Sequence, residues 1–295
     1  MRLKASRYVT SSTDLLFDIM IDIKSHAERI KDQGYTLVPD LIDQATREGL
    51  KQDILRLHEE SKTPGPPSWW FGNAFESSPT ERMLPTVAHP ILLDLVEQLM
   101  GPFAQLDNLT LAAMPPAKPD QRGIGWHRDR WAFCPEEPGY RAPLAMNAIF
   151  YLDGLDDQMG PLRVIPKSHR QPVFMEGDTW TNPHPDELLI KPGPRDVVVI
   201  HHALLHSGTA NHSDRLRFFF SIYYNKSWLR ATDHHTGPRT QAVIAQARAR
   251  NDHRTLRLFG IEEQLQARCN HAFRTSDEGF WKEWAEADRK ALRMD

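Results

Sequence analysis

Cysteine is scarce in this sequence, with Cys134 and Cys269 the only two. Two cysteines cannot build a disulfide framework or a cysteine-based zinc site, and they favour a reducing, cytoplasmic compartment. Long apolar runs are missing as well: the chain turns polar directly after its first residues, and no later stretch approaches the roughly 18 apolar residues that cross a bilayer. We therefore expect a cytoplasmic, soluble protein without a membrane partner.

A strong charge of one sign is also absent. The 36 Lys and Arg residues nearly balance 39 Asp and Glu residues, which leaves a formal net charge of -3. Without an extended basic field the chain has no electrostatic basis for binding nucleic acid. The 295 residues are 40% hydrophobic and 25% charged, an ordinary composition for a globular protein. We expect one domain, because β-rich single domains approach this length.

Helical patterns flank the middle of the sequence. Apolar residues at helical spacing predict a helix that ends near Gly34, because glycine commonly terminates helices. Residues 1–101 form the predominantly helical N-terminal part, with a short strand at 35–39, and residues 229–295 form the C-terminal part. The predicted helices span residues 13–33, 43–60, 89–100, 240–257 and 277–294.

The middle of the chain, about residues 102–228, carries β-strand signals instead. Short apolar segments are interrupted by Gly, Pro and Asp at intervals typical of a sandwich or barrel. We place strands at residues 109–114, 145–152, 162–165, 196–201 and 218–224. Upstream, residues 63–73 are rich in Pro, Gly and Trp, which is typical either of an irregular surface loop or of the rim or lid of a pocket.

A metal-binding pattern lies in the β region. His127 and Asp129 are two residues apart and therefore share one face of an extended segment. His206 follows Asp129 by 206 − 129 = 77 residues, a separation that a barrel closes by placing distant strands side by side. Two imidazoles and one carboxylate occupy one face of an octahedral metal and leave the other positions open, the ligand pattern of non-heme Fe(II) oxygenases.

Two further blocks give this triad a context. Asn211, Ser213 and Arg217 follow His206 by five, seven and eleven residues. Residues 147–153 and 160–169 form a strand, a glycine-containing turn and the segment Val-Ile-Pro-Lys-Ser-His. Together these blocks resemble the phytanoyl-CoA dioxygenase-like family of Fe(II)/2-oxoglutarate oxygenases over about residues 108–225. Lys167 departs from the glycine usual in the family and affects a turn more than the chemistry.

The resemblance implies a fold and an activity. The fold is a double-stranded β-helix core (jelly-roll, cupin-like), mainly β with flanking helices, as a single oxygenase domain. The activity is that of an Fe(II)/2-oxoglutarate dioxygenase that uses O2 to hydroxylate a C–H bond and forms succinate and CO2. His127, Asp129 and His206 would be the metal ligands and catalytic residues. Related halogenases carry a small residue in place of the carboxylate, so Asp129 disfavours halogenation.

The far carboxylate of 2-oxoglutarate needs a planar, permanently charged partner, which arginine supplies. The resemblance assigns this role to Arg217, although Arg215 has the same strand parity and competes for it. Ser213 is either a donor to the same carboxylate or a turn-stabilising hydroxyl. Asn147 is either a cosubstrate contact or an ordinary strand amide. Asn108 and Thr110 are further candidates for contact with 2-oxoglutarate.

The substrate is a small molecule bound in a pocket with aromatic walls. Arg130 could pair with a carboxylate or phosphonate of the substrate, whereas each tryptophan could equally be core packing. The sequence does not decide whether the substrate is a secondary-metabolite intermediate, an amino acid or amine, an alkylphosphonate or an acyl thioester. The candidate pocket residues are Trp126, Arg130, Trp131, Phe133, Trp70 and Trp228.

Two other classes compete with the oxygenase. A cupin-type lyase or isomerase would use the triad without 2-oxoglutarate, and a non-catalytic module would only bind metal. Arg217, in register with Asn211 and Ser213, argues against both. Succinate release from 2-oxoglutarate separates these classes. We expect a monomer or a homodimer.

Overall fold

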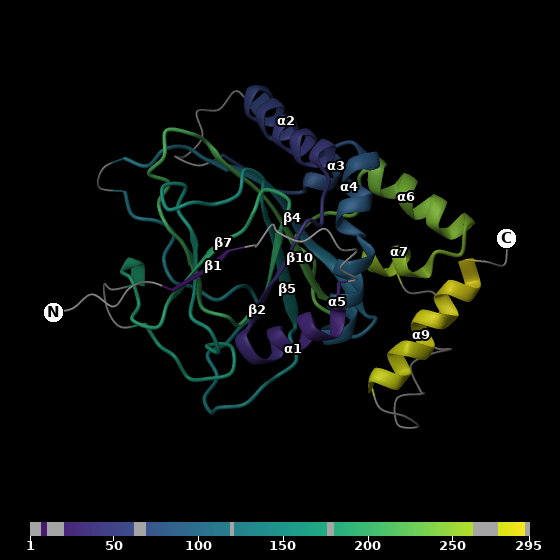
Figure 1. Cartoon of the computed structure of the whole chain (residues 1–295). Coiled ribbons are helices and arrows are strands. Elements are labelled where there is room, and N and C mark those ends of the chain that lie inside the picture. The colour runs from purple at the N-terminus through teal and green to yellow at the C-terminus, as the bar shows by residue number, and fades with distance from the viewer. Residues whose placement is uncertain are drawn as a thin grey trace. The chain divides into compact units, whose positions relative to one another are not determined.

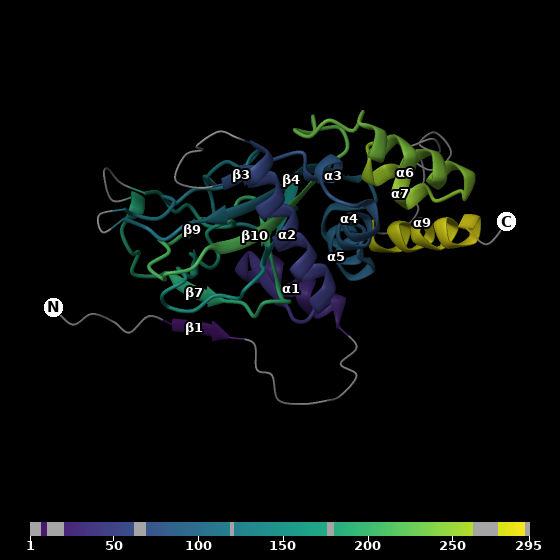
Figure 2. The ribbon, with the colours of Figure 1, turned by 90° about the horizontal axis from the view of Figure 1, so that it is seen from above.

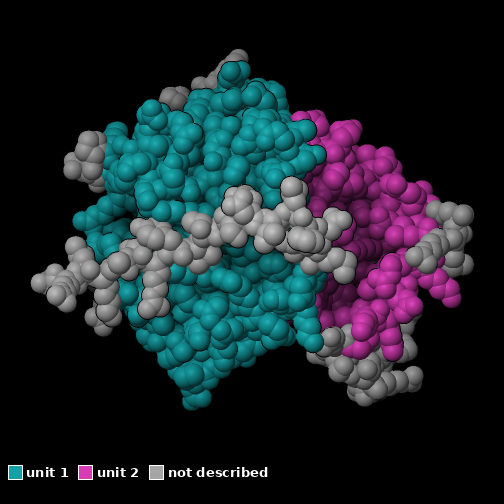
Figure 3. Space-filling view, in the orientation of Figure 1, with its two compact units in different colours: residues 1–71, 110–221 teal, residues 72–109, 222–295 magenta. Residues whose placement is uncertain are grey.

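The computed structural model describes residues 7–10, 21–61, 69–118, 121–175, 180–261 and 277–292. The chain divides into two compact units: unit 1 contains residues 1–71 and 110–221, and unit 2 contains residues 72–109 and 222–295 (Figure 3). Two strands continue from one unit into the other, β4 (Ala104–Met114) and β10 (Arg217–Lys226). The single oxygenase domain expected over the whole chain stays a prediction.

The larger of two sheets has the strand order β2-β8-β5-β10-β4-β3, and each of these strands lies wholly or partly in unit 1. Its central strands β5 and β8 pair antiparallel, as do β2 with β8 and β3 with β4. Every residue of β5 and β8 is buried, which explains why β8 consists almost entirely of valine and isoleucine. The bounds are β2 Tyr35–Val38, β3 Trp69–Phe71, β5 Ala145–Tyr151 and β8 Val197–His201.

The second sheet of unit 1 has the order β1-β7-β6-β9. Strand β1 (Arg7–Thr10) lies parallel to β7 (Leu188–Lys191) at the edge of this sheet, as Figure 2 shows. Strand β6 (Leu162–Val164) pairs antiparallel with both β7 and β9 (His206–Gly208). Residues from both sheets share one apolar cluster that includes Ile149, Val198, Leu162 and Ile190. Two sheets around a common core, with helices alongside, confirm the predicted sheet-rich fold.

Two helices of unit 1 end close to the predicted positions, but the first begins at Ile23, because Asp22 caps it there, and residues 21–22 of the predicted helix are not helical. Helix α1 (Ile23–Gln33) is capped by Asp22, whose carboxylate accepts a hydrogen bond from the Ser25 nitrogen at 3.2 Å. Gly34 ends α1 in the left-handed region, with φ 87°. Helix α2 (Gln44–Ser61) matches the second predicted helix. Residues 13–20 of the first predicted helix lie outside the described residues.

The Pro- and Trp-rich stretch is only partly described. Residues 63–68, the larger part of the expected loop or lid, lie outside the described residues. Residues 69–71 form strand β3, which pairs with β4 through Trp69 and Ala113. The expectation of an irregular loop is therefore wrong for these three residues, because β4 offers them a free sheet edge.

Unit 2 is mainly helical (Figure 1). The helical stretch expected at 240–257 is two helices, because Asn251 takes a positive φ of 54° and the Asp252 carboxylate caps the next helix through the Thr255 nitrogen at 3.0 Å. Among the described residues, no helix has both the length and the apolar character needed to cross a membrane. The helices are α3 Ala74–Ser77, α4 Thr80–Val87, α5 Pro90–Met100, α6 Pro238–Ala249, α7 His253–Leu258 and α9 Asp277–Leu292.

Candidate metal and cosubstrate site

The three predicted metal ligands lie together in unit 1. The ligand atoms of His127, Asp129 and His206 are all within 4.8 Å of one another. The Asp129 Oδ1 atom is 3.6 Å from the His206 Nε2 atom and 4.0 Å from the His127 Nε2 atom. Two nitrogen atoms and one carboxylate oxygen that converge in this way are donors suited to a divalent transition metal.

Backbone pairing creates this arrangement. His127 and His206 form an isolated antiparallel bridge, in which each main-chain nitrogen donates to the other's carbonyl oxygen at 3.0 Å. The Asp129 nitrogen donates to the His202 carbonyl oxygen at 2.8 Å. The bridge places residues that are far apart in sequence directly opposite each other, so their imidazoles meet on one face with ring centroids 4.2 Å apart.

The far nitrogen of each imidazole fixes its tautomer. His127 Nδ1 lies 2.8 Å from the Gly125 carbonyl oxygen, and His206 Nδ1 lies 3.0 Å from the Leu204 carbonyl oxygen. A carbonyl oxygen only accepts hydrogen bonds, so each Nδ1 carries the proton and each Nε2 keeps its lone pair for a metal. Burial lowers the pKa of His206, the charge of His127 lowers it further, and the Asp129 carboxylate opposes the shift. The donor set therefore fits a bound metal ion.

The three ligands differ in their exposure to solvent. The side chain of His127 is 41% exposed, whereas those of His206 and Asp129 are 5% and 4% exposed. Ligands beyond the three side chains would therefore approach from the side of His127.

Asn147 lies beside the triad on strand β5. Its Nδ2 atom donates to Asp129 Oδ2 at 3.5 Å, and its Oδ1 atom accepts a hydrogen bond from Ser221 at 2.8 Å. The Ser221 hydroxyl thereby fixes which way the amide faces. In this position Asn147 orients the carboxylate and leaves Asp129 Oδ1 towards the two histidines. Its expected contact with 2-oxoglutarate stays a prediction.

Arg217 is a buried cation at the start of β10, only 4% exposed. Its Nη1 atom donates to the carbonyl oxygens of Met159, Gly160 and Thr209 at 2.9, 2.6 and 2.9 Å. Among the described residues, its Nη2 atom meets only the Met114 sulfur, at 3.0 Å, and its buried Nε atom has no partner. No carboxylate among the described residues pairs with Arg217, and burial lowers its pKa. A buried guanidinium with unused donors calls for an anion.

A cavity of about 210 Å³ lies at this guanidinium. Its lining includes Ile124 and Thr209, which lie three residues before His127 and three residues after His206. The antiparallel pair of segments that carries the two histidines therefore leads from the triad to the cavity. The remaining lining residues are Met114, Pro115, Ala117, Gln121, Arg122, Gly123, Ala210, Asn211 and Arg217.

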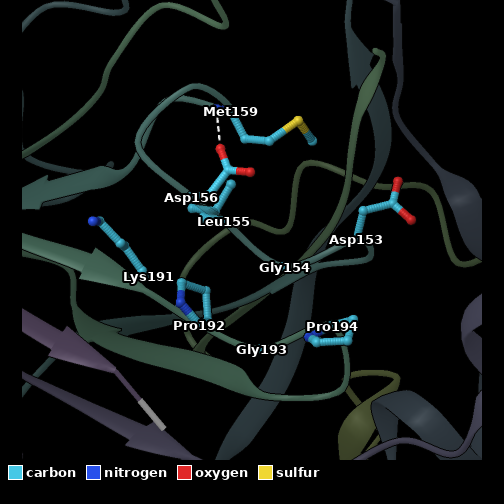
Figure 4. A pocket seen from close by; sticks show the side chains of 9 residues that line it. All are labelled: Asp153, Gly154, Leu155, Asp156, Met159, Lys191, Pro192, Gly193 and Pro194. Carbon is cyan, nitrogen blue, oxygen red and sulfur yellow. Dashed lines mark hydrogen bonds between the residues drawn. The ribbon is translucent and has the colours of Figure 1, made fainter. Parts of the chain in front are cut away.

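A tight turn at residues 156–160 contacts the Arg217 guanidinium through its carbonyl oxygens. Asp156 Oδ1 accepts hydrogen bonds from the main-chain nitrogens of Gln158 and Met159 at 2.9 and 2.7 Å, and Figure 4 shows the second of these. The turn continues into Gly160, whose φ is 80°. A Cβ atom there would lie 2.4 Å from Arg217 Nη1, so only glycine lets the backbone approach the guanidinium this closely.

The structure separates Arg217 from its competitor. The Arg215 side chain is 63% exposed and lies 3.9 Å from Asp156. Ser213 stabilises the turn at residues 211–215, because its hydroxyl donates to Asn211 Oδ1 at 2.6 Å. Asn211 in turn donates to the Met114 and Arg215 carbonyl oxygens at 3.1 and 2.7 Å. These contacts support the turn-stabilising role of Ser213, and its role as a cosubstrate donor stays a prediction.

The remaining cosubstrate candidates lie on β4. Thr110 is buried in unit 1. Asn108 belongs to unit 2, where its amide donates to Asp233 at 2.7 Å. The structure therefore shows a structural partner for Asn108, and contact of either residue with 2-oxoglutarate stays a prediction.

The predicted pocket residues do not form one cluster in the structure. Trp126 is buried against Ile165 and Leu205, with its indole nitrogen donating to the Asn182 carbonyl oxygen at 2.8 Å. This is the core-packing alternative. Trp70 is 52% exposed and packs edge-on against Phe219, and Trp228 lies in unit 2 beside Phe103.

The three predicted pocket residues that follow Asp129 differ in their exposure and backbone conformation. Arg130 and Phe133 are exposed, Phe133 by 84%. Trp131 takes a φ of 68°, rare for a bulky residue, and its buried indole nitrogen has no hydrogen-bond partner in the part of the chain that the structure describes. Strain next to a functional residue is a common companion of a binding site, so Trp131 remains a candidate substrate contact.

The sequence pattern missed two neighbours of the triad. Arg128 donates to the carbonyl oxygens of Ala203, Ser168 and Val173 at 2.9, 3.1 and 3.1 Å and so ties three loops to the segment between two ligands. Trp180 packs directly on Gly125. The alternation that pairs His127 with Asp129 would have placed Arg128 on the opposite face, but no sequence signal links Trp180 to this site.

Known proteins resemble this chain in both sequence and structure. Residues 30–219 match the sequence model of the phytanoyl-CoA dioxygenase family. An L-proline trans-4-hydroxylase of Streptomyces griseoviridis is 30% identical over 169 residues, which are 46% of this chain. The match spans 60% of the length of that hydroxylase.

Solved structures share the fold. The epimerase SnoN, solved with Fe3+, alpha ketoglutarate and nogalamycin RO, has a TM-score of 0.56 and 21% identity over 74% of this chain and 96% of its own. HygX from Streptomyces hygroscopicus, solved with nickel and 2-oxoglutarate, has a TM-score of 0.60 and 12% identity over 70% of this chain and 88% of its own. At these identities the likeness establishes the fold, and it confirms the predicted jelly-roll core.

Proposed function

Because the chain belongs to the phytanoyl-CoA dioxygenase family, we propose that it is an Fe(II)- and 2-oxoglutarate-dependent dioxygenase. It oxidises, by hydroxylation, an unactivated C–H bond of a small molecule. His127, Asp129 and His206 hold the iron, and their Nε2 and carboxylate atoms already converge. Bound iron and 2-oxoglutarate supply oxygen activation, in which O2, 2-oxoglutarate and the substrate give hydroxylated product, succinate and CO2.

The observation that carries this proposal is the state of Arg217. It is buried beside a cavity, with no described carboxylate as partner. The distal carboxylate of 2-oxoglutarate would neutralise this guanidinium and accept from Nη2, which otherwise meets the Met114 sulfur, and from Nε, which has no partner among the described residues. A metal-only module or a cupin-type lyase has no need of such a cation. The protein thus positions both ends of the cosubstrate, one at the triad and one at Arg217.

A small amino-acid-like substrate is the class that we favour. The L-proline trans-4-hydroxylase relative acts on a free cyclic amino acid, and the opening at His127 gives a small molecule access to the triad. L-proline is therefore the first compound to test, beside other cyclic and acyclic amino acids.

The test is succinate formation by the purified protein with Fe(II), 2-oxoglutarate and ascorbate, alone and with each amino acid. We expect the wild type to release succinate, faster with the true substrate, and Arg217→Met to lose this release while it still binds Co(II). Arg215→Met is the matched control, because the Arg215 side chain is 63% exposed. Metal binding by a wild type that neither binds nor consumes 2-oxoglutarate would contradict the proposal and favour the cupin-type alternative.

A further inference from the structure

Trp180 occupies the place of a missing side chain. If Gly125 carried a Cβ atom, that atom would lie 1.5 Å from Cε3 and 1.7 Å from Cζ3 of the Trp180 indole. The ring therefore sits directly on the Gly125 backbone, where the side chain of residue 125 would otherwise be. Any other residue at position 125 would displace it.

The alternation of side chains places this indole on the same face as the metal ligands. His127 and Asp129 share one face of their segment, since their ligand atoms converge. Gly125 is two residues before His127, so its side-chain position is on that same face. Trp126, between them, points the other way into the cluster of Ile165 and Leu205. The alternation therefore assigns the Trp180 indole to the same face of the segment as the His127 imidazole.

Hydrogen bonds fix the chain at Trp180 in this position. The Trp180 carbonyl oxygen accepts from the Trp126 nitrogen at 2.7 Å, and the Asn182 carbonyl oxygen accepts from the Trp126 indole at 2.8 Å. Arg122 donates to the Thr181 hydroxyl at 3.0 Å. These contacts tie residues 180–182 to the segment 122–126, so the indole forms a fixed aromatic wall over Gly125.

The wall is open towards solvent. Trp180 is 53% exposed, and the neighbouring His127 side chain is 41% exposed. A flat, half-exposed indole beside the accessible side of a metal site offers a surface for a planar or cyclic apolar group. We propose that Trp180 is a specificity-determining residue, against which an apolar ring of the substrate packs during the reaction. This inference rests on the proposed oxygenase function for its kinetic part only.

A binding measurement without turnover tests the surface itself. The protein is labelled with 5-fluorotryptophan, loaded with Zn(II) and 2-oxoglutarate, and its Trp180 19F resonance is assigned by its loss in Trp180→Phe. We expect cyclohexanecarboxylate to shift this resonance saturably and propionate, which has the same charge and no ring, to leave it unmoved. A resonance that responds to neither probe, or to both equally, overturns the proposal.

A kinetic measurement tests the role in specificity. With the compound that most increases succinate formation, Trp180→Ala should raise its KM by about tenfold, the loss of roughly one ring contact. Trp180→Phe should keep most of the wild-type KM, and the KM for 2-oxoglutarate should not change. Phe174→Ala is the control, since Phe174 is 70% exposed and outside the proposed wall. An unchanged substrate KM in an active Trp180→Ala protein overturns the inference, whereas absence of succinate from the wild type overturns the proposed function instead.

Discussion

The imidazole of His127 is oriented by a residue that has no side chain: its Nδ1 atom lies 2.8 Å from the carbonyl oxygen of Gly125. The same glycine is covered by Trp180. Gly125 therefore orients the metal ligand through its carbonyl group, and its lack of a Cβ atom leaves room for the Trp180 indole.

Gly125→Ala should consequently weaken metal binding. The added methyl group would overlap the indole, so residue 125 and Trp180 must move apart, and the shift of residue 125 draws its carbonyl oxygen away from His127 Nδ1. Loss of such an outer-shell hydrogen bond lowers metal affinity by about 10- to 100-fold. Calorimetric titration with Co(II) measures the effect. Gly139→Ala is the control, since a Cβ atom at Gly139 meets nothing within 4 Å; equal losses in both variants would disprove the role of Gly125.

Gly160→Ala should weaken 2-oxoglutarate binding and leave metal binding intact. A Cβ atom at Gly160 would lie 2.4 Å from Arg217 Nη1 and push the guanidinium off its three carbonyl oxygens. We expect at least a tenfold higher Kd for 2-oxoglutarate, roughly 1.4 kcal/mol, measured by thermal shift with the cosubstrate.

The matched control for this change is Gly154→Ala. Gly154 has a similar positive φ, 72° against 80° for Gly160, but its nearest neighbours are Pro192 and Pro194. Both alanines should destabilise the protein by about 1–2 kcal/mol, since a left-handed backbone disfavours a side chain. A Gly154→Ala protein with the same defect in 2-oxoglutarate binding would show that backbone strain, and not Arg217, is responsible.

Acid should destabilise unit 1 through its buried histidines. Burial lowers the pKa of His169 from 6.5 to about 4, and that of His201 well below its usual value. At pH values between 6.5 and about 4, His169 binds a proton in the unfolded chain but not in the folded protein. The free energy of unfolding therefore falls as the pH drops from 6.5 to about 4, by about 1.4 kcal/mol per pH unit for each such group.

Urea denaturation of the metal-free protein across this pH range measures the slope. His169→Gln should flatten it, because the variant loses one proton-binding group. His212→Gln, at an exposed histidine, should keep the wild-type slope. Parallel curves for wild type and His169→Gln would refute the assignment.

In unit 2, the stability of α9 should depend on one buried ion pair. Arg257 Nη2 donates to Asp288 Oδ2 at 2.6 Å, and the two side chains are 3% and 7% exposed. Asp288→Ala removes this carboxylate from a buried guanidinium, which costs about 3–5 kcal/mol. Glu286→Ala removes an exposed carboxylate from the same helix and should change the free energy of unfolding by less than about 0.5 kcal/mol. The measurement is urea denaturation followed by circular dichroism.

Local patterns in the sequence were sufficient to predict the long helices and strands. The helix end at Gly34 and the strand at residues 145–151 follow from glycine's conformational freedom and from a continuous apolar run. Strand β9 has only three residues, His206–Gly208, and its pairing with β6 supplies its stability. A segment that short has no periodicity of its own, so sequence analysis did not detect it.

Within the site, the sequence by itself determined that His127 and Asp129 share a face, because side chains of an extended chain alternate. Strand parity alone left Arg215 and Arg217 equivalent, and the spacing from His206 favoured Arg217. Tertiary structure distinguished them, by holding Arg215 in an exposed turn and burying Arg217 against three carbonyl groups. It also brought Trp180 onto Gly125. Contacts between residues distant in sequence depend on how the sheets pack, and no local spacing encodes them.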